Sequence, residues 1–172
     1  KVYFDRVKFE MSEASNLFFN SFGDQRDCFL GIENTVRNFD NILKYPGITD
    51  IKGKLKGMNA VLVGTGPSLT NEIPRLKEIQ DKCVILAADA SLKILVRNGI
   101  IPHIVCCLER DPGTSDFFKD VPYPEGSRKP LFVGFPLCDK TTIDSYDANK
   151  CLVYRNYNYY KYFESLFPKD MI

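Results

Sequence analysis

The most informative stretch of this sequence is Ala60-Val61-Leu62-Val63-Gly64-Thr65-Gly66-Pro67-Ser68-Leu69. Its four apolar residues, 60–63, are typical of a buried β-strand, and the glycine pair that follows ends the strand. Pro67 suits the first turn of a helix, where a missing N–H costs no hydrogen bond. A strand that passes through glycines into a helix presents main-chain N–H groups to an anion, so the stretch predicts a phosphate-binding turn.

The turn departs from two well-known nucleotide loops. A Walker A loop needs a lysine before its Ser or Thr, and Leu69-Thr70 supplies none. The dinucleotide fingerprint places a third glycine where this chain has Leu69. Classical NAD binding and P-loop triphosphate binding are therefore disfavoured, and a plain tight turn without a ligand remains the structural alternative.

Charged residues follow the next two predicted strands. The strand at 83–88 ends at Asp89, and the strand at 103–108 is followed by Glu109-Arg110-Asp111. Carboxyl ends of parallel strands share one edge of a sheet, where ligands bind, so these side chains are expected near Gly66. Carboxylates there could hold ribose hydroxyls, a base amine or a metal, and Arg110 could pair with a phosphate; a solvated loop with an internal ion pair is the alternative. The predicted nucleotide-binding residues are Gly64, Thr65, Gly66, Pro67, Ser68, Leu69, Asp89, Glu109, Arg110 and Asp111.

Composition narrows the classes of function. A net charge of +1 gives no global attraction to nucleic acid or to a membrane surface, and 44% hydrophobic residues suffice for a packed core. No apolar stretch approaches the roughly 20 residues of a membrane span, and no signal peptide is visible. The six cysteines form no CxxC pair, and Cys106 and Cys107 should point to opposite faces of a strand. We expect reduced thiols, no metal site and a cytoplasmic protein.

The chain divides into two parts by pattern. Residues 1–57 are predicted to form an N-terminal helical extension and a connector, because Phe29, Ile32, Val36, Phe39 and Leu43 recur at spacings of three and four. Residues 58–172 alternate short apolar runs with amphipathic segments. This predicts an α/β fold, a Rossmann-like, mostly parallel sheet with helices on both faces. The expected strands are 60–64, 83–88, 103–108, 130–135 and 151–154, and the expected helices between them are 69–80, 91–98, 113–119 and 139–147. A terminal helix is expected within 154–167, and the domain is expected to be incomplete at its C-terminus.

Read together, several motifs resemble the motility-associated accessory-factor family of flagellin glycosyltransferases. The resemblance covers roughly residues 25–135 and keeps the family's order of motifs. The motifs are Asn34-Thr35, Pro46-Gly47-Ile48, Leu55-Lys56-Gly57, Val63-Gly64-Thr65-Gly66-Pro67-Ser68-Leu69, Ala87-Ala88-Asp89-Ala90-Ser91, Gly99-Ile100-Ile101-Pro102-His103 and Leu108-Glu109-Arg110-Asp111-Pro112. This family shares its Rossmann-like domain with 6-hydroxymethylpterin diphosphokinase-like proteins.

The resemblance implies transfer of a nonulosonic (sialic-like) acid from its CMP-activated form to a Ser or Thr hydroxyl of flagellin. Residues 64–69 would hold the CMP phosphate and ribose, and Asp89 and Glu109 would line the donor pocket. The diphosphokinase resemblance implies the alternative of pyrophosphoryl transfer from ATP with Mg²⁺. A non-catalytic nucleotide-fold scaffold is the third hypothesis. The general base is unassigned, since His103 starts its strand at the end opposite the predicted site, and homo-oligomerisation is left open.

Overall fold

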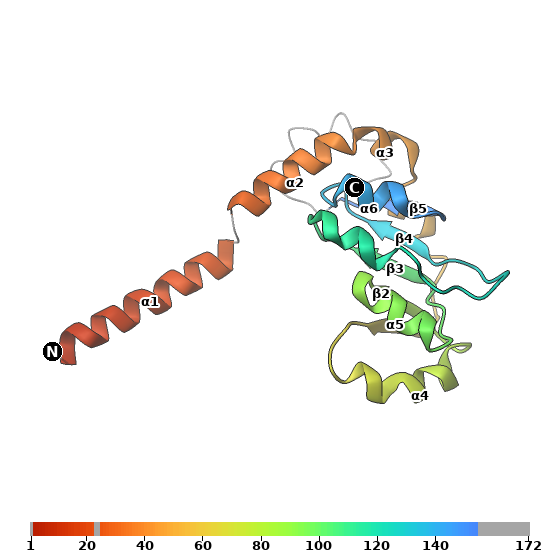
Figure 1. The fold of residues 1–172 in the computed structure, drawn as a ribbon, viewed down its shortest axis with the longest axis horizontal. Coiled ribbons are helices and arrows are strands. Elements are labelled where there is room, and N and C mark those ends of the chain that lie inside the picture. The colour runs from red at the N-terminus through yellow and green to blue at the C-terminus, as the bar shows by residue number, and fades with distance from the viewer. Residues whose placement is uncertain (1, 23–24, 155–172) are drawn as a thin grey trace.

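The computed structural model describes residues 2–22 and 25–154, which form one α/β unit with a helical N-terminal extension (Figure 1). Five parallel strands make a single sheet in the order β1-β2-β3-β4-β5. The strands are β1 (Ala60–Val63), β2 (Val84–Ala88), β3 (Ile104–Cys107), β4 (Leu131–Gly134) and β5 (Lys150–Leu152). All five predicted strands are thus confirmed, and so is the α/β class.

Helices precede the sheet and connect its strands. The α-helices are α1 (Val2–Phe22), α2 (Gln25–Arg37), α3 (Phe39–Lys44), α4 (Leu69–Ile79), α5 (Leu92–Arg97) and α6 (Lys140–Ser145). The 3₁₀ helices are η1 (Ile48–Ile51), η2 (Asp89–Ser91) and η3 (Pro112–Phe117). Each helix predicted between strands therefore has a counterpart, and the one after β3 is a 3₁₀ helix.

The main core lies on one face of the sheet. Ile85, Val105 and Phe132 are fully buried there, in a cluster that also contains residues of α4, α5 and α6. This one-sided arrangement follows from the strand order. When every strand is added on the same side of the previous one, right-handed crossovers place all the connecting helices on the same face.

The opposite face has a much thinner cover. Ile48 and Ile51 of η1 pack there against a small cluster of Ile104, Val133 and Cys151. Further along the sheet, Leu62 of β1 is 81% exposed. Helical segments thus lie on both faces, as predicted, but in unequal measure, because η1 reaches only the β3–β5 side.

Helices α2 and α3 form one nearly continuous rod. The main-chain N–H of Asn38 donates to Asn34 O at 2.9 Å, and that of Ile42 donates to Asn38 O at 2.9 Å, so helical bonding passes through the junction. Asn34, Asn38 and Asn41 are buried on one side of the rod. The apolar residues of the 3-and-4 repeat are exposed on another side; we call them the α2–α3 seam, and they are Phe29, Ile32, Val36, Phe39 and Leu43.

Three further expectations concern cysteines, membranes and the tail. The cysteines are free thiols, five of them at least half-buried and Cys28 exposed on α2, and Cys106 and Cys107 belong to the clusters on opposite faces, as predicted. Within residues 2–22 and 25–154, no helix has the length and apolarity to cross a bilayer. The helix expected within 154–167 lies outside the described residues apart from Tyr154, and the boundary at residue 57 stays a prediction.

Candidate functional site at the carboxyl edge of the sheet

The loop from Gly64 to Ser68 leaves β1 at the carboxyl edge of the sheet and is exposed throughout. Leu69, the first residue of α4, is buried in the main core and anchors the end of the loop. Its N–H donates to Gly66 O at 3.0 Å, which closes the turn into the helix. Ser68 makes no side-chain cap bond, so the helix N-terminus carries no cap from its own hydroxyl.

Neither glycine of this loop is required by the fold of the described chain. Gly64 and Gly66 do not have positive φ angles, so the backbone conformation does not demand glycine. A Cβ atom at Gly64 would meet nothing within 4 Å, and one at Gly66 would meet only Ser68 Oγ at 3.9 Å. The space over both residues is open, which is what close approach of a ligand to the main chain requires.

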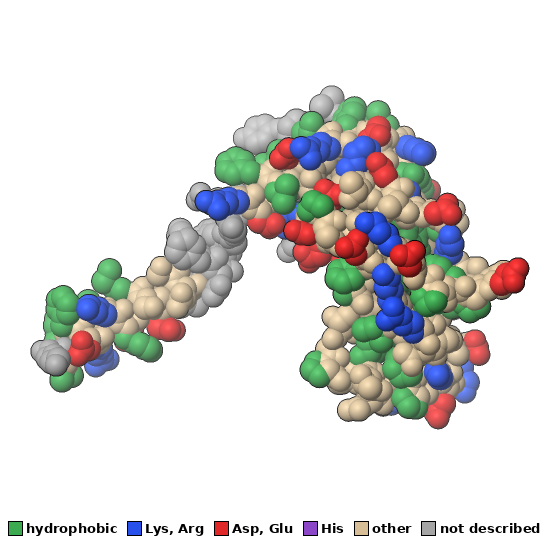
Figure 2. Space-filling view, in the orientation of Figure 1, with side chains coloured by type: hydrophobic (Ala, Val, Ile, Leu, Met, Phe, Trp, Pro, Cys, Tyr) green, Lys and Arg blue, Asp and Glu red, His purple; other side chains and the backbone are tan. Residues whose placement is uncertain are grey.

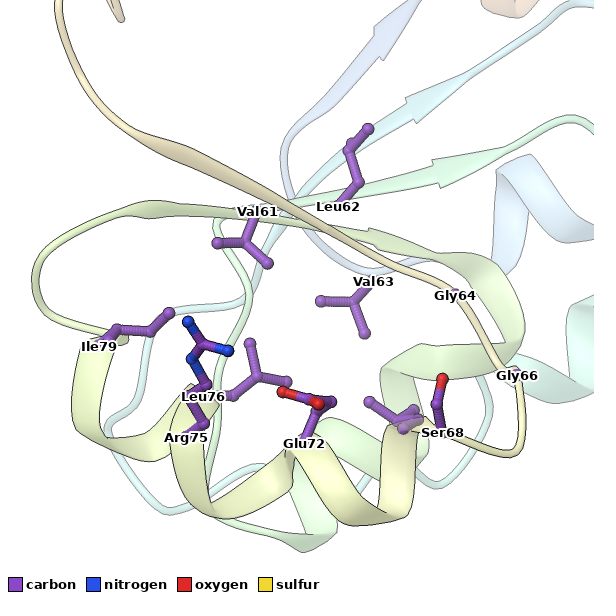
Figure 3. Close-up of a pocket in the computed structure, with 11 residues that line it drawn as sticks. Val61, Leu62, Val63, Gly64, Gly66, Ser68, Glu72, Arg75, Leu76 and Ile79 are labelled. Atoms are coloured by element: carbon purple, nitrogen blue, oxygen red, sulfur yellow. The ribbon is translucent and has the colours of Figure 1, made fainter.

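A groove of about 500 Å³ lies beside this loop, between β1 and α4 (Figure 3). Val61 and Val63 of β1 form its apolar wall, and Glu72 and Arg75 project into it from α4. The groove extends along β1, the strand at the end of the sheet. Of the ten predicted site residues, it is lined by Gly64, Gly66, Ser68 and Leu69.

Asp89 begins η2 directly after β2, next to the base of the Gly64 loop. Its Oδ1 accepts a hydrogen bond from Ala90 N at 2.7 Å, which leaves the other carboxylate oxygen available. Ser91, fully buried two residues later, places its Oγ 3.1 Å from Val63 O and 2.6 Å from Ala88 O. Ser91 therefore connects the ends of β1 and β2, a positioning role that the sequence analysis did not assign.

Acidic groups also follow β3. Glu109 and Asp111 are exposed, and Asp111 Oδ1 accepts from Gly113 N at 2.7 Å, so this carboxylate caps η3. Burial raises the pKa of the Cys106 thiol on β3, and the negative charge of Asp89 raises it further. The charge of Asp89 therefore acts on the end of the neighbouring strand. The carboxyl edge thus carries three carboxylates, one after β2 and two after β3.

Arg110 is engaged by α2. Its Nη1 donates to Asp27 Oδ2 at 2.6 Å, and its side chain is 19% exposed. The guanidinium stem passes over Gly31, where an added Cβ would lie 2.7 Å from Nε. The phosphate-binding role predicted for Arg110 would require this ion pair to open, so the structure gives the side chain a different partner.

Three asparagines of α2 and α3 hold the loops after β3 and β4. Asn34 Nδ2 donates to Arg110 O and Leu137 O, both at 3.1 Å. Asn38 Nδ2 donates to Pro136 O at 2.9 Å and to Cys138 O at 2.8 Å. Asn41 Nδ2 continues the series to Asn38 Oδ1 and to Asp144 Oδ1.

The role of these asparagines was not predicted from the sequence. Asparagine is a poor residue for a helix interior, so its recurrence at i, i+4 and i+7 was the available signal. The amide groups supply the hydrogen bonds that the loop carbonyls need in a water-poor contact.

His103 lies at the amino edge, as expected, remote in the sheet from the loop. Its Nδ1 accepts from Ile85 N at 3.1 Å, which requires a neutral ring nitrogen at that position. Burial, together with the charge of Arg128, lowers the pKa of His103 below its ordinary value of 6.5. The contact ties β2 to the start of β3 and is structural.

The structure therefore brings the Gly64–Leu69 loop and Asp89 together, with Glu109 and Asp111 one strand further on. The part of the chain that the structure describes contains no group of three His, Cys, Asp or Glu side chains arranged to hold an ion.

No curated protein matches the sequence of this chain. Among solved structures, a MAf glycosyltransferase from Magnetospirillum magneticum AMB-1 is similar, with a TM-score of 0.49 and 21% sequence identity. The match covers 59% of this chain and 17% of that one, so the chain spans less than a fifth of that enzyme's length.

A sequence family gives a broader match. The 6-hydroxymethylpterin diphosphokinase MptE-like family matches residues 33–171. This range contains the five strands, the Gly64–Leu69 loop and the acidic residues of the carboxyl edge. The chain therefore belongs to the 6-hydroxymethylpterin diphosphokinase MptE-like family.

Proposed function

We propose that this chain is the nucleotide-binding part of a glycosyltransferase whose donor is a CMP-activated nonulosonic acid. The observation that carries the proposal is the open space over Gly64 and Gly66, two glycines that neither backbone conformation nor packing explains. A ligand that contacts the main chain is the remaining physical reason for two residues without a Cβ at this point.

Main-chain N–H groups are the proposed catalytic contribution of this loop. When the sugar leaves CMP, negative charge develops on the phosphate, and preorganised N–H donors stabilise that charge. The uncapped N-terminus of α4 adds a favourable dipole at the same place. We assign the phosphate to residues 64–69 and the ribose and base to Asp89 and Glu109.

The acceptor follows from the resemblance to flagellin glycosyltransferases, and we propose a flagellin Ser or Thr hydroxyl. Its general base is not among the residues assigned to the site. We place the protein in the cytoplasm, where a reducing environment would keep its buried cysteines as thiols.

The alternative is pyrophosphoryl transfer from ATP, and the family's name favours it. That reaction uses Mg²⁺, which prefers several oxygen ligands in octahedral geometry. Here Asp89 and Asp111 each direct one carboxylate oxygen to a main-chain N–H, and Glu109 is exposed beside them. Each aspartate still offers its second oxygen, and Mg²⁺ commonly takes one or two carboxylates together with substrate phosphates and water. The donor set does not separate the two reactions, and we favour the CMP-sugar donor because the ordered sequence motifs resemble those of the flagellin glycosyltransferases.

Titration calorimetry with CMP, CMP-sialic acid, NAD, and ATP with and without Mg²⁺ tests the proposal. Selective binding of the two cytidine ligands is expected. Mg²⁺-dependent selectivity for ATP would establish the alternative instead, and failure of every ligand to bind would leave the scaffold hypothesis.

The same titration with the Gly66→Val variant tests the role of the loop. A Cβ there meets only Ser68 Oγ at 3.9 Å, and the loop is exposed, so the folded chain should accept a valine. The valine fills the space assigned to the phosphate, so loss of CMP binding with unchanged unfolding is expected. Lys56→Val, on the exposed connector, introduces the same side chain away from the site and should bind CMP normally. Normal CMP affinity in Gly66→Val would contradict the assignment of the loop.

A further inference from the structure

The α2–α3 seam is an exposed apolar surface with the spacing of a coiled coil. Its five residues are separated by 3, 4, 3 and 4 positions, which is the a/d repeat of a heptad. Phe29 is 71% exposed, Val36 68% and Leu43 60%. A regular apolar stripe of this kind on a rigid helix marks an interaction site for another helix.

The seam is prevented from turning toward the core. Asn34 and Asn38 project from another side of the same rod and are fully buried in hydrogen bonds to the loops after β3 and β4. Rotating the rod would break these bonds and leave buried carbonyl groups without donors. The apolar residues therefore remain available to a partner outside the domain.

Helix α1 carries a matching seam. Phe4, Val7, Met11 and Ala14 are separated by 3, 4 and 3 positions, and all four are exposed, Phe4 at 65% and Met11 at 68%. Figure 2 shows hydrophobic side chains standing along α1 without a neighbour that covers them. The chain thus contains both halves of a helix–helix contact.

The charges beside the two seams select an antiparallel orientation. In an antiparallel pair an a position of one helix lies opposite a d position of the other, so Phe4 pairs with Phe39, Val7 with Val36 and Met11 with Ile32. The e positions of the two helices then adjoin, so Lys8 flanks Glu33, a residue of opposite charge. In the parallel orientation Met11 lies opposite Val36 and Glu10 flanks Asp40, a carboxylate that Lys140 already binds at 2.9 Å, so no attractive pair forms.

The partner that the fold favours is a second copy of this chain. Only residues 23 and 24 separate the end of α1 from the start of α2, and α1 projects away from its own domain (Figure 1). Short connections between complementary elements favour exchange between copies. We propose that two copies form a dimer in which α1 of each packs antiparallel on the α2–α3 seam of the other.

Disulfide trapping tests this arrangement directly. Cys28→Ser removes the exposed thiol of α2, and Val7→Cys with Val36→Cys then places two facing thiols on the paired seams. Mild oxidation should give a dimer on a non-reducing gel. Phe9→Cys with Val36→Cys is the matched control, because Phe9 is exposed away from the α1 seam, and it should not cross-link. A cross-link within one chain, or none at all in the seam pair, would overturn the proposal.

Light scattering over a dilution series provides a second readout. The unmodified chain of 19.7 kDa should have twice that mass in solution. Val36→Asp should halve the mass while circular dichroism stays the same, because Val36 has no role in the domain core; Phe9→Asp should leave the dimer intact. Lengthening the connection between α1 and α2 with a Gly-Ser linker should also yield monomers, since α1 can then fold onto its own seam. A monomeric unmodified chain would contradict the proposal.

Discussion

Arg110 lies so close to Gly31 that any Cβ at position 31 would displace the arginine side chain. A Cβ at this position would lie 2.7 Å from Arg110 Nε and 3.3 Å from Arg110 Cδ. The same arginine pairs with Asp27 one helical turn away on α2. The contact fixes α2 over the loop that carries Glu109 and Asp111, and so connects the helical extension to the candidate site.

Gly31→Ala should therefore fail to stabilise the protein. Alanine normally stabilises a helix interior by about 1 kcal/mol relative to glycine, but here it displaces the Arg110 side chain. We expect no gain, or a loss, in the free energy of unfolding measured in urea. In an Arg110→Ala background the same substitution should recover about 1 kcal/mol. An equal increase in the free energy of unfolding in both backgrounds would show that the contact does not affect stability.

Asn38→Ala should destabilise the fold strongly. The substitution removes the donor to Pro136 O and Cys138 O and leaves both carbonyl groups in a buried contact, at a cost of about 2 kcal/mol or more. Asn71→Ala, on the exposed side of α4, is the control and should change the free energy of unfolding by about 0.5 kcal/mol or less. Similar small effects at both positions would contradict the role assigned to the asparagines.

Ser91→Ala should affect both stability and the site. Loss of the hydroxyl that joins Val63 O and Ala88 O should cost about 1 kcal/mol. Because this hydroxyl positions the base of the Gly64 loop, CMP affinity should fall as well. Ser145→Ala removes a hydroxyl near the surface and should leave affinity unchanged. An unaltered affinity in Ser91→Ala would restrict its role to stability.

The stability of the protein should fall as the pH drops below the ordinary His pKa of 6.5. His103 has a lowered pKa in the folded state, so the unfolded chain takes up its proton first. The stabilisation is present above pH 6.5 and is lost as the pH falls through the lower folded value. His103 is the sole histidine, so its contribution can be isolated. His103→Asn, which retains an acceptor for Ile85 N, should lack this part of the pH dependence when unfolding is followed at pH 5 to 8.

The sheet was predictable because its signals are local. Each strand is a short apolar run ended by glycine, proline or charge, and the Gly64–Leu69 loop follows from its own residues. The orientation of α2 was not predictable in this way. The spacing of its apolar residues predicts a helix. Which face of that helix is buried depends on hydrogen bonds from Asn34 and Asn38 to carbonyl groups about 100 positions along the chain.

The ion pair of Arg110 could not be predicted for the same reason. Its place at the end of a strand suggested an anion partner, but Asp27, 83 positions earlier, reaches it through the packing of α2. Asp111 shows the complementary case, because its use as a cap for η3 depends only on residues that follow it directly.

Because the strands are added in one direction only, the Gly64 loop follows the strand at one end of the sheet. At the far end of the sheet, Gly47 bridges to Leu152 and occupies the border of β5, whereas β1 has no partner on its outer side among the described strands. A strand that joined β1 there and crossed over the Leu62 face would reverse the direction of winding at this loop. The phosphate-binding turn would then lie at the crevice where doubly wound sheets bind their ligands. Addition of that strand would therefore both extend the sheet and complete the pocket.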